Sequence, residues 1–489
     1  METEQNATDK IEPYVWKIAG VVILGMMMSI LDTTIVNVAL DTLAKDLHST
    51  ISQIQWVATG YLLSLAAVIP LTGWSARRFG AKRVYISSIV LFTIGSFLCG
   101  LAESSTSLIF FRVLQGIGGG MIMPIAQMIT AEVAGPKRMG RVMSIVVMPA
   151  MLAPILGPVL GGLILQNFHW SWIFFVNVPV GIVATVLGVK MLPDSQLGEA
   201  GKLDVRGLIL MVTGIPLLVY GLSEIGSTGT FTSPKVVWPI IGGLILIAAF
   251  AWHALRTTRP LLDIRLYTNR IFAAASMTTF GLGAALFGTM ILVPLYYQQV
   301  RDESVIVTGL LVGPQGLGML MCAPFAARLA QRFGGGRVAF VGVSILCLSS
   351  VPFVFIGADT SIPFLSFMLL IRGVGIGLSF LPTTTVAFAS LRKDQLSDAT
   401  PQMNVVQRVG GAIGTAVLAV VLQRASVGAS STAELASAFG TAYWWALGIV
   451  VLSLIPCVIL WRAEKPGGSE TEESPEEQLA ELELEPLGA

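Results

Sequence analysis

Leu31-Asp32-Thr33-Thr34-Ile35-Val36-Asn37-Val38-Ala39-Leu40 closes the first long apolar stretch of this chain, which begins at Trp16. The stretch is long enough to cross a bilayer, which takes about 20 apolar residues. Asp32 is its only carboxylate. Because a carboxylate is costly in hydrocarbon, we expect Asp32 to face a cavity, find a partner or take up a proton.

The composition is that of a polytopic membrane protein. Of 489 residues, 54% are hydrophobic and 12% charged, and the mean hydropathy is +0.77. The cysteines and histidines are scattered, without metal-ligand spacing or a clustered nucleophile. We therefore expect no metal and no enzyme. We also expect no nucleic-acid partner and no cofactor, since a proton gradient would supply the driving force. The N-terminus lacks a signal-peptide cleavage site, so the first helix should remain in the mature protein.

Apolar runs of about 20 residues predict an all-α membrane protein with fourteen transmembrane helices. The predicted spans are 17–40, 54–75, 83–102, 107–130, 141–166, 170–192, 205–224, 236–255, 271–297, 306–329, 338–357, 362–388, 402–423 and 439–461. If both termini are cytoplasmic, four Lys and Arg lie in outer loops, and Arg112, Arg372 and Arg408 lie within helices. All the others fall on the inner side, as the positive-inside rule requires.

The sequence contains an internal repeat. The segment from Gly73 to Val84 (GWSARRFGAKRV) is similar to that from Ala327 to Val338 (ARLAQRFGGGRV), 254 residues later. Arg112 precedes Gly116-Ile117-Gly118, and Arg372 precedes Gly375-Ile376-Gly377. Such repeats are typical of transporters that rock two halves around a central site.

The repeat divides the chain into four parts. We predict six-helix bundles over 1–195 and 263–462, with two inserted helices in 196–262. Residues 463–489 hold nine glutamates and no aromatic residue, and we expect a disordered, acidic cytoplasmic tail.

Four motifs in order resemble the major facilitator superfamily, and most of all its fourteen-helix drug:proton antiporters of the QacA and EmrB type. The motifs are Leu31–Leu40, Gly73–Arg83, Arg112–Gly118, and Gly157–Gly162 with the following Trp170–Gly181. The resemblance implies two six-helix bundles with two inserted central helices, in the cytoplasmic (inner) membrane of the cell.

The second motif is the family's inner gate loop. Its residues here are Gly73, Arg77, Arg78, Gly80, Lys82 and Arg83. Family members usually have an acid where this chain has Arg77, and the resemblance implies that this acid helps to latch the inner gate. In this chain the latch must use another acid or be weaker.

The fourth motif places small residues around a proline in the fifth helix: Gly157, Pro158, Gly161 and Gly162. Small residues let helices approach closely, and proline permits a bend. Plain helix packing explains the spacing equally well, and the resemblance favours a hinge.

Helical rise links Asp32 to the fourth helix. Asp32 lies nine residues before Asp41 and therefore about 13 Å below the outer surface. Counted from Thr106, Arg112 is about 9 Å deep and Gln115 about 13 Å deep. If the first and fourth helices are neighbours, as the family fold implies, both reach Asp32. We predict that Asp32 and Arg112 couple transport to protons; a static ion pair is the alternative.

Methionines are dense on the helices expected to line the cavity. Met28, Met123 and Met151, with Gln115, are our candidate cavity residues, because flexible side chains suit varied apolar ligands. Ordinary core packing explains many of these methionines as well. Arg408 is predicted to lie in a polar patch at the inner end of its helix, with Gln402, Asn404 and Gln407. Arg372 has no acidic partner at its predicted depth.

The sequence predicts a monomeric, proton-coupled exporter of amphipathic, often cationic compounds that works by alternating access. Its partners are the small-molecule substrate, protons and the lipid bilayer. Three intramembrane arginines against one aspartate also suit export of an anionic metabolite or amphiphile. A transport-dead sensor or scaffold is the alternative from another class, and the intact Asp32, Arg112 and fifth-helix motif argue against it.

Overall fold

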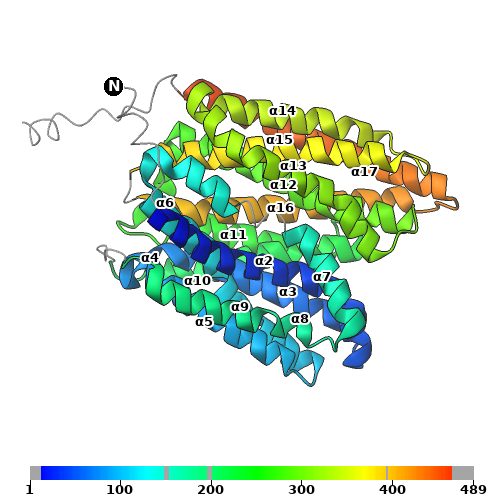
Figure 1. Cartoon of the computed structure of the whole chain (residues 1–489), viewed down its shortest axis with the longest axis horizontal. Helices are drawn as coiled ribbons and strands as arrows, with labels where there is room; N and C mark the ends of the chain where they lie inside the picture. Colours follow the sequence, from blue (N-terminus) through cyan, green and yellow to red (C-terminus); the bar gives the residue numbers. More distant parts are fainter. Residues whose placement is uncertain (1–12, 148–152, 195–200, 393–394, 465–489) are drawn as a thin grey trace, which may run out of the picture.

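The computed structural model describes residues 13–147, 153–194, 201–392 and 395–464, and these residues form helices and connecting turns without a strand. The helices lie side by side along one axis of the molecule (Figure 1). The first part contains α2 (Pro13–Asp46), α3 (Ile51–Val68), η1 (Ile69–Leu71), α4 (Thr72–Phe79), α5 (Ala81–Gly100), α6 (Ser105–Val147), α7 (Ala153–Asn167), α8 (Trp172–Phe175) and α9 (Asn177–Met191). The middle contains α10 (Val205–Thr228), α11 (Pro234–Arg256) and η3 (Ile264–Thr268). The last part contains α12 (Arg270–Gln299), α13 (Val305–Phe333), α14 (Gly335–Val354), α15 (Ile362–Ala389), α16 (Leu396–Ser426) and α17 (Thr432–Ala463).

Twelve of the described helices are long and apolar enough to cross a membrane, and α13 is a thirteenth if its two bent parts form one span. These spans confirm the prediction of an all-α, multi-pass membrane protein. The described part of α7 has 15 residues, so the count of fourteen stays a prediction. The start of α2 and the end of α17 lie at the same end of the bundle (Figure 1), and the side of the membrane that this end faces also stays a prediction.

One predicted loop is wrong. The sequence pattern separates the fourth and fifth helices by a loop at 131–140. In the structure, α6 is a single helix of 43 residues from Ser105 to Val147 and includes that stretch. α7 begins only at Ala153. Counting apolar residues detects only the part of a helix that lies in lipid. The predicted span therefore ends at the first charged residues, even where the helix continues. A helix can leave the apolar layer and continue in water, and α6 does so even through Gly135, Pro136 and Gly140, residue types of poor helix propensity.

The inserted helices connect the two predicted halves. α10 packs against α3 on one side and against α16 on the other, and α11 packs against α10. One apolar cluster joins Ala66 of α3 to Met211 and Ile215 of α10. A second cluster joins Leu218 of α10 to Ala416 of α16. α10 therefore lies beside both halves, and α11 lies against α10.

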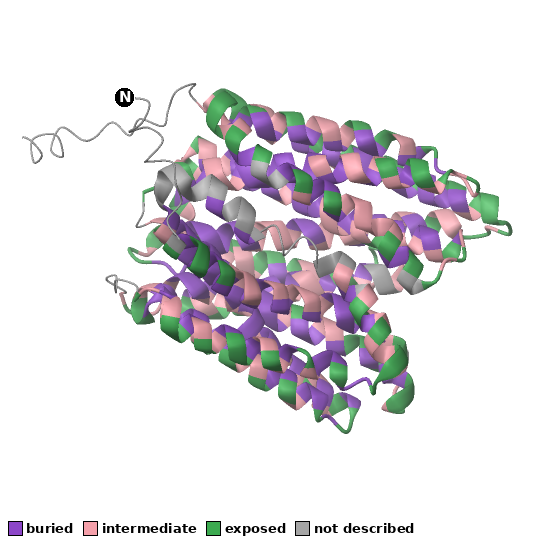
Figure 2. Ribbon diagram, in the orientation of Figure 1, coloured by how far each residue is buried: buried purple, intermediate pink, exposed green. Residues whose placement is uncertain are grey.

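The outer surface of the bundle is apolar. Figure 2 shows buried residues on the faces that the helices turn toward one another, and exposed ones on the outside. The exposed residues include large apolar side chains, such as Trp238, Leu348 and Phe355, each at least 70% exposed. Water would penalise such a surface, and a lipid bilayer favours it.

Candidate functional site

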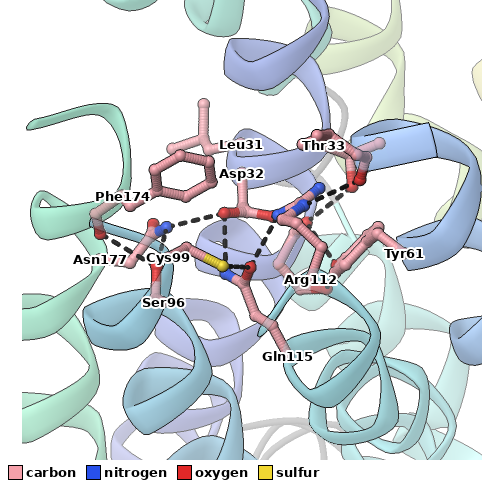
Figure 3. A network of polar contacts seen from close by, with 12 residues as sticks. Leu31, Asp32, Thr33, Tyr61, Ser96, Cys99, Arg112, Gln115, Phe174 and Asn177 are labelled. Carbon is pink, nitrogen blue, oxygen red and sulfur yellow. Dashed lines mark hydrogen bonds and ion pairs between the residues drawn. The ribbon is translucent and has the colours of Figure 1, made fainter. Parts of the chain in front are cut away.

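A fully buried carboxylate lies at the centre of the first half. Asp32, on α2, has an exposed fraction of 0% and accepts hydrogen bonds from three side chains on two other helices (Figure 3). Its Oδ2 accepts from Arg112 Nη1 at 2.6 Å, and its Oδ1 accepts from Gln115 Nε2 at 2.9 Å. Oδ1 also accepts from Asn177 Nδ2 at 2.9 Å. The structure thus brings Asp32, Arg112 and Gln115 together.

Arg112 is held by more than its ion pair. Gln115 lies three residues further along α6, on the same face, and its Oε1 accepts from Arg112 Nη1 at 2.7 Å. Arg112 Nε donates to the backbone oxygen of Val57 on α3 at 3.2 Å. The guanidinium lies over the ring of Tyr61, 4.1 Å from its centroid. A buried ion pair needs such additional contacts, because both charges have lost their hydration.

Sequence reasoning missed two members of this cluster, Asn177 and Ser96. Asn177 begins α9, and its Nδ2 donates to Ser96 Oγ of α5 at 3.0 Å as well as to Asp32. Ser96 Oγ donates to the backbone oxygen of Phe174 at 2.9 Å. A signal for Asn177 was present, since it is the one amide in the motif from Trp170 to Gly181. Because a buried polar group needs partners, an amide in an apolar stretch points to a polar neighbour.

Close helix contacts position these side chains. A Cβ added at Gly95 of α5 would lie 2.7 Å from the Cα of Gln115, so α5 and α6 can meet here only without a side chain.

On α7, a Cβ at Gly157 would collide with the side chain of Thr34, two residues from Asp32. At Gly161 it would meet Ile35 at 3.4 Å, an ordinary contact. Gly162 is half-buried. The Pro158 side chain lies outside the described residues, and whether this stretch is a hinge stays a prediction.

The gate loop meets the other half of the molecule through an acid that the sequence did not identify. Arg77, at the end of α4, donates from Nη1 to Asp398 Oδ1 at 2.7 Å and to Ser397 Oγ at 2.6 Å, both in the first turn of α16. Gly73 permits this approach, because a Cβ there would collide with the backbone oxygen of Ser397. In this chain the base of the pair lies on α4 and the acid on α16.

The other residues of the gate loop have local surroundings. Gly80 has a φ of +86°, which favours glycine, and its N–H donates to the Ala76 oxygen at 2.9 Å to end α4. Lys82 pairs with the exposed Asp194 at 3.0 Å. Arg78 and Arg83 are exposed.

The candidate cavity methionines lie in apolar packing. Met28 is 2% exposed and belongs to a hydrophobic cluster that also contains Leu378 and Leu381 of α15, in the other half. Met123 is half-buried against the same cluster. Met151 lies outside the described residues. The cluster crosses the contact between the halves, and a role in substrate binding stays a prediction.

In the predicted polar patch of α16, Asn404 Nδ2 donates to Gln127 Oε1 of α6 at 2.8 Å. Gln402 Nε2 donates to the Asp263 backbone oxygen at 3.0 Å. Asn404 therefore adds a second polar contact between α16 and the first half.

Comparisons with known proteins agree with the motifs and the fold. The family model described as Major Facilitator Superfamily matches residues 22–415. "Multidrug resistance protein B homolog" of Mycobacterium tuberculosis is 40% identical over 86% of this chain and 78% of its own length. "Multidrug export protein EmrB" of Escherichia coli is 30% identical over 81% of this chain and 77% of its own. The crystal structure of the human organic anion transporter MFSD10 has a TM-score of 0.63 at 15% identity, and it covers 91% of this chain and 100% of its own. This chain belongs to the major facilitator superfamily of membrane transporters.

Proposed function

We propose that this protein exports amphipathic, often cationic compounds across the cytoplasmic membrane by alternating access, and that protons bound at Asp32 drive the export. The names of its relatives, a multidrug resistance protein and a multidrug export protein, support this class of substrate. The observation that carries the proton coupling is the burial of Asp32 among donors from α6 and α9.

Protonation of Asp32 would change the packing of its helix. As a carboxylate, Asp32 only accepts hydrogen bonds, and three donors satisfy it. Once protonated, it loses its charge attraction to Arg112, and one of its oxygens becomes a donor. The O–H of protonated Asp32 could then donate to Gln115 Oε1. Because α2 meets α6 and α9 through these bonds, loading a proton favours a different arrangement of the three helices.

The contacts of Arg77 with Asp398, and of Gln127 with Asn404, support a closed inner gate in this arrangement. Both contacts join the first half to the inner part of α16. Opening toward the cytoplasm would break them. The energy for that step would come from substrate binding or from a change of protonation at Asp32.

Transport in proteoliposomes tests this proposal. The purified protein is reconstituted, a pH gradient is imposed, and movement of ethidium, a cationic amphiphile, is recorded by fluorescence. We expect ethidium to move against its gradient, and movement to stop when a protonophore collapses the pH difference. If ethidium still moves against its gradient in the presence of the protonophore, proton coupling is refuted. Ethidium binding without transport or proton release would indicate a sensor or scaffold instead.

A further inference from the structure

Arg372 is a fully buried arginine with little to bind. It lies ten residues after the start of α15, about 15 Å along the helix, and is 0% exposed. In the repeat it is the counterpart of Arg112. Its Nη2 donates to Thr289 Oγ1 of α12 at 2.8 Å, whereas its Nε and Nη1 have no hydrogen-bond partner.

The side chains beside Arg372 add one further unpaired donor. The guanidinium lies 5.9 Å from the ring centroid of Phe353, and the ring of Tyr443 packs on Phe353 at 5.1 Å. The Tyr443 hydroxyl is buried, has no hydrogen-bond partner and lies within electrostatic range of Arg372. It can donate a hydrogen bond close to this positive charge.

The chain itself does not balance this charge. Among the described residues, no aspartate or glutamate forms an ion pair with Arg372. Arginine stays protonated in proteins, and an uncompensated buried charge is strongly destabilising. Thr289 lies 257 residues after Asp32, so the repeat places a neutral hydroxyl where the first half has its carboxylate. A water molecule would satisfy the donors but leave the charge.

We propose that Arg372, Thr289 and Tyr443 form a binding site for a small monovalent anion such as chloride. The three side chains are each at most 1% exposed, so the site is enclosed and favours a small ion. A guanidinium and a phenol with unused donors suit an anion. The bound anion supplies in the second half the negative charge that Asp32 supplies in the first.

Thermal unfolding of the purified, full-length protein in detergent tests this site without measuring transport, so its outcome is separate from that of proton-coupled export. Chloride is titrated against gluconate at constant pH and ionic strength, and Tm is followed by tryptophan fluorescence. A ligand that binds only the folded protein raises Tm in a saturable way. We expect a saturable rise of several degrees with chloride. A Tm that is equal in chloride and gluconate would overturn the proposal.

Variants locate the effect. Arg372→Gln should lose the chloride-dependent rise; if it keeps the full rise, the anion binds elsewhere and the proposal fails. Two buried tyrosines provide a matched pair that alters only hydroxyls. Tyr443→Phe should shift the chloride titration to at least threefold higher concentration. Tyr296→Phe should not shift it, since the Tyr296 hydroxyl already donates to the Gly357 oxygen. Equal responses of the two variants would also overturn the assignment, which keeps it testable if Arg372→Gln does not fold.

Formate distinguishes two kinds of monovalent anion, a carboxylate and an inorganic ion. If formate raises Tm as chloride does, the site accepts carboxylates, including the carboxylate of an anionic compound. If chloride alone acts, the site holds an inorganic ion. Both results support a site for a small monovalent anion.

Discussion

Arg112 and Arg372 occupy equivalent places in the two halves, and their hydrogen-bond partners differ in chemistry. Both are at most 1% exposed, and each hydrogen bonds to the first helix of its own half. Arg112 meets the carboxylate of Asp32, whereas Arg372 meets the hydroxyl of Thr289. One arginine therefore has a partner that can gain or lose a proton, and the other has a partner that cannot.

This difference indicates that the halves divide the work. A threonine hydroxyl does not titrate at physiological pH, so Arg372 offers no proton site of its own. We infer that proton coupling resides in the first half and that the second half serves as a fixed counterpart. The predictions that follow test this division.

The largest effect should come from Asp32. Asp32→Asn removes the titratable group with little change in size, and we expect gradient-driven ethidium transport to fall at least 100-fold while the protein still folds. Asp41→Asn is the matched control, because it makes the same change on α2 at an exposed site paired with Lys45. Transport in proteoliposomes measures both. Parental transport by Asp32→Asn would place coupling elsewhere.

Arg112→Gln separates a moving relay from a fixed brace. If Arg112 keeps Asp32 charged, its loss leaves a buried carboxyl that is stabilised by holding its proton. Substrate should then release few protons, at least tenfold fewer per folded molecule than in the parent. Arg112→Lys, which keeps the charge but not the fork of donors, should release an intermediate number.

A brace predicts another result. In that case Arg112→Gln lowers yield and thermal stability, yet the surviving protein releases protons normally. Proton release by the purified protein on addition of ethidium, divided by the folded fraction, decides between the two. Equal release would eliminate the relay.

Two helix contacts, one in each half, should differ in stiffness. In the second half, a Cβ at Gly414 of α16 would collide with the backbone of Ala284 on α12. A Cβ at Gly157 of α7 would collide mainly with the Thr34 side chain, and the nearest backbone atom of Thr34 would be 3.3 Å from it. We expect Gly414→Ala to cost about 1–3 kcal/mol of stability, because a backbone must move, and Gly157→Ala to cost less.

Thermal unfolding and transport together check this prediction. Gly157→Ala should still impair transport, since it disturbs the helix that carries Asp32. Gly161→Ala is the control on the same helix, where a Cβ fits at 3.4 Å. A Gly157→Ala variant with the larger loss of stability would contradict the proposed difference in stiffness.

Some of this site was predictable from the sequence, for physical reasons. Helical rise fixes depth, so Asp32, Arg112 and Gln115 were expected at matching levels. Depth alone does not say which face of α5 or α9 turns toward α2, and Ser96 and Asn177 were missed for that reason. The contact of Arg77 with Asp398 joins residues 321 positions apart, beyond any local pattern. Thr289 was not identified as the partner of Arg372, because the sequence does not say which face of α12 turns toward α15.

The smallest effect should come from the link between the halves. Arg77 and Asp398 pair at 2.7 Å with side chains 24% and 19% exposed, so solvent screens them, and the pair contributes about 1 kcal/mol or less. Arg77→Asp places two acids together and should loosen the inner gate. Amide hydrogen exchange in residues 72–79 and 396–404 should then rise several-fold.

The double variant Arg77→Asp with Asp398→Arg rebuilds the pair with its charges exchanged. If the contact works by charge attraction, exchange in both segments should return most of the way to the parental rate, and transport with it. Arg78→Asp is the matched control, because it reverses an exposed charge next to the latch without touching Asp398. Suppose the double variant exchanges as fast as Arg77→Asp alone. The close approach of Gly73 to Ser397 would then hold the halves together, and the charges would have no part in the gate.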